Sequence, residues 1–278
     1  MRQGGGVVNL DTIKQREKAY HERIRTGDRE FPPLDPAQHR RDWLDPTWTT
    51  GVDRYNDARR EFHAHVAARG GWSGRRVLDY GCGNGTWALY LRLTGAARVV
   101  GFDLAESGVR RGMQRVRAQG EADAVQLVCG DATRLPLAEA SIEMAVGHGV
   151  LHHVIKYPGI FPELHRVLRP GGRAFFLENL ADNPLFRLWW WWKGEVEEGD
   201  VPIFEREVRR LARDFARVEV TGTDFFHSAA TFLFRPQPAA WRRAALRATH
   251  AADRRLFKLL PAARRWGSFS FIELEKRA

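Results

Sequence analysis

One short segment limits what this chain can fold into more than any other. A strand-like run, 76–80, leads into a loop with glycines at alternate positions, Gly81, Gly83 and Gly85, and a helical stretch follows. Glycine lets such a loop turn tightly and lets a ligand come close to the backbone. The helix N-terminus after it favours negative charge. Strand, glycine loop and helix in this order predict a nucleoside-binding loop of an α/β protein.

The spacing of these glycines differs from that of the dinucleotide fingerprint G-x-G-x-x-G, because the third glycine arrives one residue early. Asp79 stands just before the loop, where its carboxylate would repel a pyrophosphate. Beside an ammonium group the same carboxylate would be stabilising by roughly 1.5–3 kcal/mol. The loop therefore favours a nucleoside that carries an amino group over a dinucleotide.

Two further aspartates follow the next two strand candidates. Asp103 closes the run 99–103, where a carboxylate can accept both ribose hydroxyls of a nucleoside; the alternative is a helix N-cap. Asp131 follows the third strand, and it could accept a hydrogen bond from an adenine amino group while the Ala132 N–H bonds the ring. The alternative for Asp131 is an Asx-turn.

The pattern of the chain from residue 75 onward agrees with this fold class. Short apolar runs alternate with helical stretches, which is typical of a parallel sheet with helices on both faces. The strands that we expect are 76–80, 98–102, 125–129, 142–147 and 173–178, followed by 217–221 and 268–276, and the helices between the early strands are 86–94, 108–119 and 160–168.

Two helices are expected upstream of the first strand, at 11–25 and 53–69. Along the second, Ala58, Phe62 and Val66 recur at a spacing of four residues, which indicates one buried face.

Together these residues resemble the class I S-adenosylmethionine-dependent methyltransferases over roughly residues 75–180. The segment 77–85 resembles the family's D/E-x-G-x-G-x-G loop, and 164–172 is similar to the stretch before the family's fifth strand. The resemblance implies S-adenosyl-L-methionine as cofactor, S-adenosyl-L-homocysteine as product and no metal. The cofactor-binding residues that it implies are Asp79, Gly81, Cys82, Gly83, Gly85, Asp103, Leu104, Asp131, Ala132 and Gly147.

The family's fold is a Rossmann-like, seven-stranded α/β sheet whose last strand is antiparallel, and the two late strands would complete it. We expect a helical cap over residues 1–70 and the cofactor-binding core over 71–180. Residues 181–278 would supply the last two strands, with an insertion between them that forms a lid over the acceptor site within the same domain.

Three histidines, His148, His152 and His153, follow the fourth strand. Their Leu-His-His sequence resembles the small-molecule branch of the family, which acts on natural products of secondary metabolism, quinones and sugars. In that branch a histidine of this motif and an acidic residue after the fifth strand handle the proton, and Glu178 holds the acidic position here. A structural role is the alternative for each histidine. The sequence offers no firm choice between His152 and His153, and we prefer His153.

The acceptor site is indicated by less specific features. Gly147 and Gly149 predict a roomy acceptor pocket. Four consecutive tryptophans, 189–192, cannot all face one core, because successive helical positions turn by about 100°. With the apolar run 225–234 and the arginine-rich stretch 242–265, they predict a lipophilic acceptor pocket or a membrane-facing patch. The alternative is a lid helix packed against the sheet.

The net charge bears on whether the chain binds nucleic acid, and the cysteines bear on its redox compartment. The net charge of +10 would suit nucleic acid, so an RNA methyltransferase or a basic nucleic-acid-binding protein is the alternative function. The chain lacks the Asn/Asp-Pro-Pro-aromatic loop of base-methylating enzymes, which makes nucleic acid a poor partner. Two cysteines, without zinc-site spacing, suit a reducing cytosol.

No secretory signal and no membrane-spanning run is visible, so we expect a cytoplasmic protein, with a peripheral location at a membrane as the alternative. The predicted function is methylation of oxygen or carbon on a hydrophobic small molecule such as a lipid, prenyl or polyketide-like compound. The sequence does not determine the oligomeric state.

Overall fold

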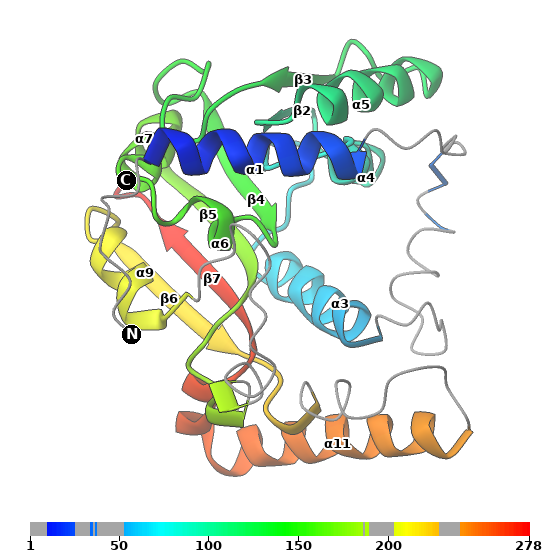
Figure 1. Ribbon diagram of the computed structural model, residues 1–278, viewed down its shortest axis with the longest axis vertical. Coiled ribbons are helices and arrows are strands. Elements are labelled where there is room, and N and C mark those ends of the chain that lie inside the picture. Colours follow the sequence, from blue (N-terminus) through cyan, green and yellow to red (C-terminus); the bar gives the residue numbers. More distant parts are fainter. Residues whose placement is uncertain are drawn as a thin grey trace, which may run out of the picture.

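The structure of the protein, a computed structural model, describes residues 10–25, 34–35, 37, 53–185, 187–188, 203–227 and 240–278. Its centre is one seven-stranded sheet with the strand order β3-β2-β1-β4-β5-β7-β6 (Figure 1). The strands are β1 (Arg76–Tyr80), β2 (Arg98–Asp103), β3 (Val125–Cys129), β4 (Ile142–His148), β5 (Leu168–Asn179), β6 (Arg217–Gly222) and β7 (Phe269–Glu275).

The first five strands pair in parallel, whereas β7 runs antiparallel to both of its neighbours, β5 and β6. The predicted Rossmann-like sheet with an antiparallel last strand is therefore confirmed. β5 begins earlier than predicted, because Leu168 already pairs with Ile142, and an irregularity in the register separates this pair from the regular part of the strand.

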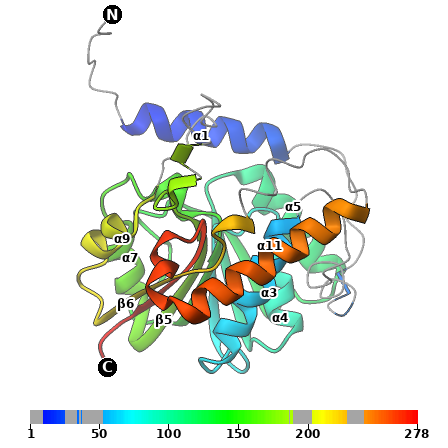
Figure 2. The ribbon, with the colours of Figure 1, turned by 90° about the horizontal axis from the view of Figure 1, so that it is seen from below.

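Helices cover both faces of the sheet (Figures 1 and 2). They are α1 (Leu10–Arg25), α3 (Asp53–Ala67), α4 (Thr86–Leu93), α5 (Glu106–Ala118), α6 (Leu151–Val154), α7 (Ile160–Val167), α9 (Glu205–Leu211) and α11 (Ala240–Leu259), followed by the 3₁₀ helix η1 (Pro261–Trp266). Two buried clusters result, since alternate residues of each strand face opposite sides. One contains residues of α7 and α9, and the other contains residues of α3, α4 and α5.

The buried face predicted for the second helix is confirmed: Ala58, Phe62 and Val66 of α3 are buried in the second cluster. α11 and η1 form the insertion between the last two strands. This insertion contacts α3, since Nε2 of His250 in α11 lies 3.5 Å from Oε1 of Glu61 in α3. α1 forms a separate outer layer (Figure 2). Within the described part of the chain, no helix combines the length and the apolar character needed to cross a bilayer.

Candidate active site

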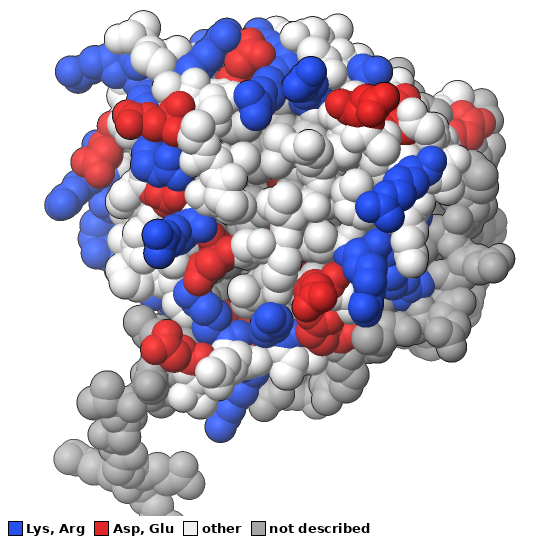
Figure 3. All heavy atoms as spheres, turned by 90° about the horizontal axis from the view of Figure 1, so that it is seen from above, with Lys and Arg blue, Asp and Glu red and all other residues white. Residues whose placement is uncertain are grey.

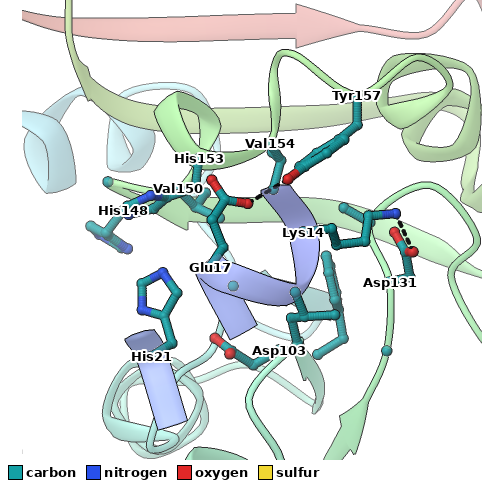
Figure 4. A pocket seen from close by; sticks show the side chains of 16 residues that line it. Lys14, Glu17, His21, Asp103, Asp131, His148, Val150, His153, Val154 and Tyr157 are labelled. Carbon is teal, nitrogen blue, oxygen red and sulfur yellow. Dashed lines mark hydrogen bonds and ion pairs between the residues drawn. The ribbon is translucent and has the colours of Figure 1, made fainter. Parts of the chain in front are cut away.

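A pocket lies at the carboxyl ends of the first four strands, beneath α1 (Figure 4). This is the edge of a parallel α/β sheet at which ligands bind. Its wall is made by Gly81, Phe102, Asp103, Leu104, Gly130, Asp131, Ala132, His148 and Gly149 from the strand ends, by Val150, His153, Val154 and Tyr157 from α6 and its flanks, and by Lys14, Glu17 and His21 from α1. The structure thus brings half of the residues that the sequence nominated into one pocket wall.

The glycine loop needs its glycines for conformation and for space. Gly81, Gly83 and Gly85 have φ angles of 76°, 54° and 73°, which lie in the left-handed region. A Cβ on Gly81 would lie 2.5 Å from a methyl of Val150, and one on Gly85 would lie 2.6 Å from a methyl of Leu127. Gly81 forms part of the pocket wall, and Gly83 donates its N–H to Asp103 at 2.8 Å.

Asp79 lies buried at the end of β1, under this loop. Burial raises its pKa to about 8, and the charge of Asp103 adds to the rise, while the Ala88 N–H opposes it. Its Oδ2 has no hydrogen-bond partner among the described residues. A buried hydrogen-bond acceptor without a partner costs free energy. It therefore marks a place where a hydrogen-bond donor of a ligand would fit.

Asp103 uses both carboxylate oxygens at the end of β2. Oδ2 accepts from the Gly83 N–H, and Oδ1 accepts from the Ala105 N–H at 2.9 Å. Ala105, and not Asp103, is the N-cap residue of α5, so the helix-cap alternative for Asp103 is wrong. The two hydrogen bonds fix the carboxylate between the glycine loop and the start of α5, on the pocket wall.

Asp131 makes the Asx-turn that was the alternative interpretation, and it also faces the pocket. Its Oδ1 accepts from the backbone N–H and the hydroxyl of Thr133, each at 2.8 Å. Its Oδ2 lies 2.5 Å from Lys14 Nζ of α1. Burial alone would raise the pKa of Asp131, but the hydrogen bonds from Lys14 and Thr133 hold it below the ordinary value.

His148 ends β4 with its ring stacked on Trp87, the centroids 3.7 Å apart and the planes at 4°. Phe62 meets the same ring edge-on at 5.2 Å. Burial lowers the pKa of His148 well below its ordinary value, and the nearby His63 and Arg59 lower it further. Neither ring nitrogen has a hydrogen-bond partner among the described residues. His148 is therefore a neutral imidazole at the pocket wall.

The structure separates the two adjacent histidines. Nδ1 of His152 lies 2.9 Å from Oε2 of Glu178, a carboxylate buried at the end of β5. The other oxygen of Glu178 accepts the backbone N–H groups of Val150 and Leu151, both at 2.7 Å. His153 instead lies on the pocket wall. Glu178 thus holds the loop after β4 together with His152, and neither of these two side chains lines the pocket.

Gly147 does not enlarge the pocket as expected. A Cβ at this position would lie 2.5 Å from Cδ1 of Phe176, so the aromatic ring of β5 fills the space. Gly149, with φ of 61°, does lie on the pocket wall. The expectation of a roomy acceptor pocket is wrong for Gly147, because the sequence does not show which ring packs against it.

Four polar side chains of the pocket were not predicted from the sequence: Lys14, Glu17, His21 and Tyr157. Glu17 is buried and accepts a hydrogen bond from the Tyr157 hydroxyl at 2.6 Å (Figure 4). It also pairs with Lys156. The His21 ring meets the His153 ring edge-on at 4.8 Å. The sequence predicted the helix α1 but carried no signal for where it docks.

Comparison with known proteins identifies the core of this fold. Residues 78–176 match the family model described as a methyltransferase domain. A demethylmenaquinone methyltransferase of Lactiplantibacillus plantarum is 30% identical over 158 residues, which cover 55% of this chain and 65% of that protein. A phthiotriol/phenolphthiotriol dimycocerosates methyltransferase of Mycobacterium leprae is 31% identical over 169 residues, covering 60% of this chain and 57% of the relative. The chain thus spans less than two thirds of the length of these curated relatives.

Among solved structures, a geranyl diphosphate C-methyltransferase of Streptomyces coelicolor A3(2), in complex with Mg²⁺, geranyl diphosphate and S-adenosyl-L-homocysteine, superposes with a TM-score of 0.61. It covers 99% of this chain and 100% of its own, at 15% identity, so it is similar in fold. Residues 78–176 therefore carry a methyltransferase domain, and the sheet order and glycine loop are those of the Rossmann-like methyltransferase fold.

Proposed function

We propose that the protein transfers a methyl group from S-adenosyl-L-methionine to oxygen or carbon of a hydrophobic small molecule, such as a lipid, prenyl or polyketide-like compound. The observation that carries this proposal is that Asp103, Asp131 and two histidines, His148 and His153, share one pocket inside a methyltransferase domain. The relatives described above are named for quinone and phthiotriol-type acceptors, which are hydrophobic.

The residues at the strand ends fit S-adenosyl-L-methionine as the methyl donor. Oδ2 of Asp79, which has no hydrogen-bond partner among the described residues, would accept a hydrogen bond from the ammonium group of S-adenosyl-L-methionine. Asp103 would accept the ribose hydroxyls, while Asp131 and the Ala132 N–H would hold the adenine. Leu104, Gly81 and the rest of the glycine loop, with Cys82, would line the donor. When bound, the donor supplies the methyl group from its sulfonium, and a neutral His148 does not repel that positive charge.

In-line methyl transfer depends mainly on positioning the two reactants. A base is required only if the acceptor loses a proton during attack. We assign that role first to His153, which lies on the pocket wall, and second to His148, which also lies there but whose lowered pKa makes it a weak base. Glu178 and His152 would act as positioning residues, because their hydrogen bonds fix the start of α6, the helix that contains His153.

We assign residues 1–70 to a cap over the donor, 71–180 to the donor-binding core, and 181–278 to the last strands and the acceptor-site lid. α1 supports the first assignment, since three of its residues line the pocket. The tryptophans 189–192, and the run 225–234 beyond residue 227, lie outside the described residues. We also place the protein in the cytoplasm, peripherally at a membrane where lipophilic acceptors gather.

Nucleic acid is not proposed as a partner. Lys and Arg side chains alternate with Asp and Glu on the face shown in Figure 3, so they form no continuous basic surface there for a phosphate backbone. The relatives described above are named for small-molecule acceptors.

Two measurements test the proposal. Incubation with isotopically labelled S-adenosyl-L-methionine and fractionated lipid or metabolite extracts, followed by mass analysis, should reveal a labelled lipophilic product. In calorimetry, Asp103→Ala should abolish S-adenosyl-L-homocysteine binding, whereas Asp123→Ala, at an exposed aspartate, should leave it unchanged. Unchanged affinity in the Asp103 variant would remove the assignment of the donor site.

A further inference from the structure

Large apolar side chains are exposed in only a few segments of the described structure. Leu188 is 61% exposed and Leu259 is 84% exposed, values far above those of core residues. Within the described residues, the exposed large apolar side chains are Leu185, Leu188, Phe226, Leu259, Leu260 and Trp266. They fall in three segments: residues 185 and 188, residue 226, and the end of α11 with η1.

Hydrogen bonds join these three segments into one surface. Nδ2 of Asn183 donates to the Phe225 carbonyl at 3.2 Å, which ties the first segment to the second. The Phe226 N–H donates to Asp253 of α11 at 2.9 Å, which ties the second to the third. These contacts link the three segments although they are distant in sequence, and Arg187 and Trp266 also line one depression, so the first and third segments lie close together.

Cations surround these apolar residues. Arg187, Arg206, Arg209 and Arg265 line one surface depression together with Trp266. The Arg265 guanidinium lies 4.3 Å from the centroid of the Trp266 ring. The acidic residues of the depression are Asp182 and Glu205, and Glu205 is paired with Arg209 at 2.7 Å. Exposed cations also continue along α11, at Arg254, Arg255 and Lys258.

The position of this surface follows from the sheet. Asn179, the last residue of β5, pairs with Phe269, the first residue of β7. The described chain on either side of this pair, 180–185 with 187–188 and η1, therefore lies at the carboxyl edge of the parallel strands. The donor pocket lies at the same edge, at the ends of β1 to β4.

Exposed leucines and a tryptophan beside arginines are the chemistry of a protein that lies in the interfacial layer of a membrane. Apolar side chains enter the boundary of the acyl chains, tryptophan prefers the headgroup level, and arginines bind anionic headgroups. A purely apolar protein partner would leave the arginines without counter-charges.

We propose that this surface, formed by 182–185, residues 187, 188 and 226, the end of α11 and η1, docks on an anionic lipid bilayer. The inference deepens the membrane location proposed above and rests on the proposed function for its purpose, because docking would turn the carboxyl edge of the sheet toward the bilayer that holds a lipophilic acceptor. Its test does not depend on methyl transfer.

The test is co-sedimentation with vesicles of phosphatidylcholine containing phosphatidylglycerol, compared with vesicles of phosphatidylcholine alone. The unmodified protein should bind the anionic vesicles, and the binding should weaken with added salt. Because one basic residue strengthens binding to an anionic surface about fivefold, Arg187→Glu with Arg265→Glu should weaken binding by about 25-fold or more. Leu188→Ser with Leu259→Ser and Leu260→Ser should reduce binding to background.

The matched control is Arg98→Glu with Arg117→Glu. Both arginines are exposed, and they lie at the start of β2 and the end of α5, at the opposite edge of the sheet. This control should bind like the unmodified protein, because both substitutions lie away from the proposed surface. Its change in charge equals that of the test variant, so a difference between the two variants reports position and not net charge. S-adenosyl-L-homocysteine affinity should be the same in all variants, which checks folding.

Three results would overturn the proposal: an unmodified protein that stays in the supernatant, equal losses in the test and control variants, or a lipid-free dimer that the leucine substitutions convert to a monomer. The last result would assign the surface to a second copy of the chain. Failure of S-adenosyl-L-homocysteine to bind the unmodified protein would instead count against the proposed methyl transfer.

Discussion

Nζ of Lys14 lies 2.5 Å from Oδ2 of Asp131 and so joins α1 to the end of β3 across 117 positions of the chain. The pair is part of a set of contacts that hold α1 over the pocket. Glu17 accepts the Tyr157 hydroxyl, and Glu22 accepts the N–H groups of Glu106 and Ser107 at the start of α5.

Lys14→Met should therefore loosen α1 without unfolding the core. The pair is partly exposed, with 24% of the lysine and 35% of the aspartate side chain accessible, so we expect a loss of about 0.5–1 kcal/mol. Amide hydrogen exchange over residues 10–25 should become about two- to fivefold faster, while exchange in β1 and β4 stays unchanged. Lys18→Met, at an exposed lysine of the same helix, is the control. Equal exchange rates over residues 10–25 in the two variants would contradict the role of the Lys14–Asp131 pair in holding α1 over the pocket.

Asp79 should make stability depend on pH in an unusual direction. Its pKa is raised from 3.8 to about 8 in the folded protein. Between these values the folded protein holds a proton that the unfolded chain has lost, so this group's contribution to stability falls as pH rises from about 4 to about 8. Asp79→Asn does not titrate. The Tm of the variant relative to the unmodified protein should therefore rise over this pH range. A difference in Tm that is the same at both ends would contradict the raised pKa.

Topology explains why the strand-end residues of the site could be predicted. In a parallel sheet the carboxyl ends of the strands meet at one edge, so a glycine loop and two aspartates at successive strand ends imply one site. Gly81, Asp103 and Asp131 do line one pocket. The fifth strand was predicted to begin at residue 173, but β5 begins at Leu168, because pairing with β4 decides where it starts.

The contributions of α1 and α6 could not be predicted. Lys14, Glu17 and His21 reach the pocket only through tertiary docking, which no local pattern encodes. The sequence alone offered no firm choice between His152 and His153 for a different reason. α6 contains only four residues, Leu151–Val154, which is too short for a periodicity to show which side chain faces the core.

Gly147→Ala should destabilise the protein through overpacking. The new methyl would lie 2.5 Å from Cδ1 and 2.7 Å from Cε1 of Phe176, a fully buried ring that cannot move away without cost. We expect a loss of about 1–3 kcal/mol in the free energy of unfolding, measured by urea denaturation. Gly120→Ala is the comparison, since nothing lies within 4 Å of its new methyl and only the φ of 73° is unfavourable. If Gly147→Ala lowered the free energy of unfolding less than Gly120→Ala does, the Phe176 ring would move aside at little cost, contrary to this prediction.

Comparison of His153→Ala with His152→Ala separates chemistry from positioning. His153 lies on the pocket wall, so its loss should lower kcat by about 10²–10⁴, the usual contribution of a general base, if the acceptor must lose a proton. Its S-adenosyl-L-homocysteine affinity and Tm should change little.

His152→Ala should act differently, because it removes the partner of one oxygen of the buried Glu178. It should lower the free energy of unfolding by about 1–3 kcal/mol and reduce kcat less than His153→Ala does. Calorimetry, thermal denaturation and single-turnover methyl transfer on the two variants together give the answer. The assignment of roles would be reversed if the His152 variant lost turnover at unchanged Tm while the His153 variant kept full activity, since the proton would then pass through the Glu178-bound imidazole.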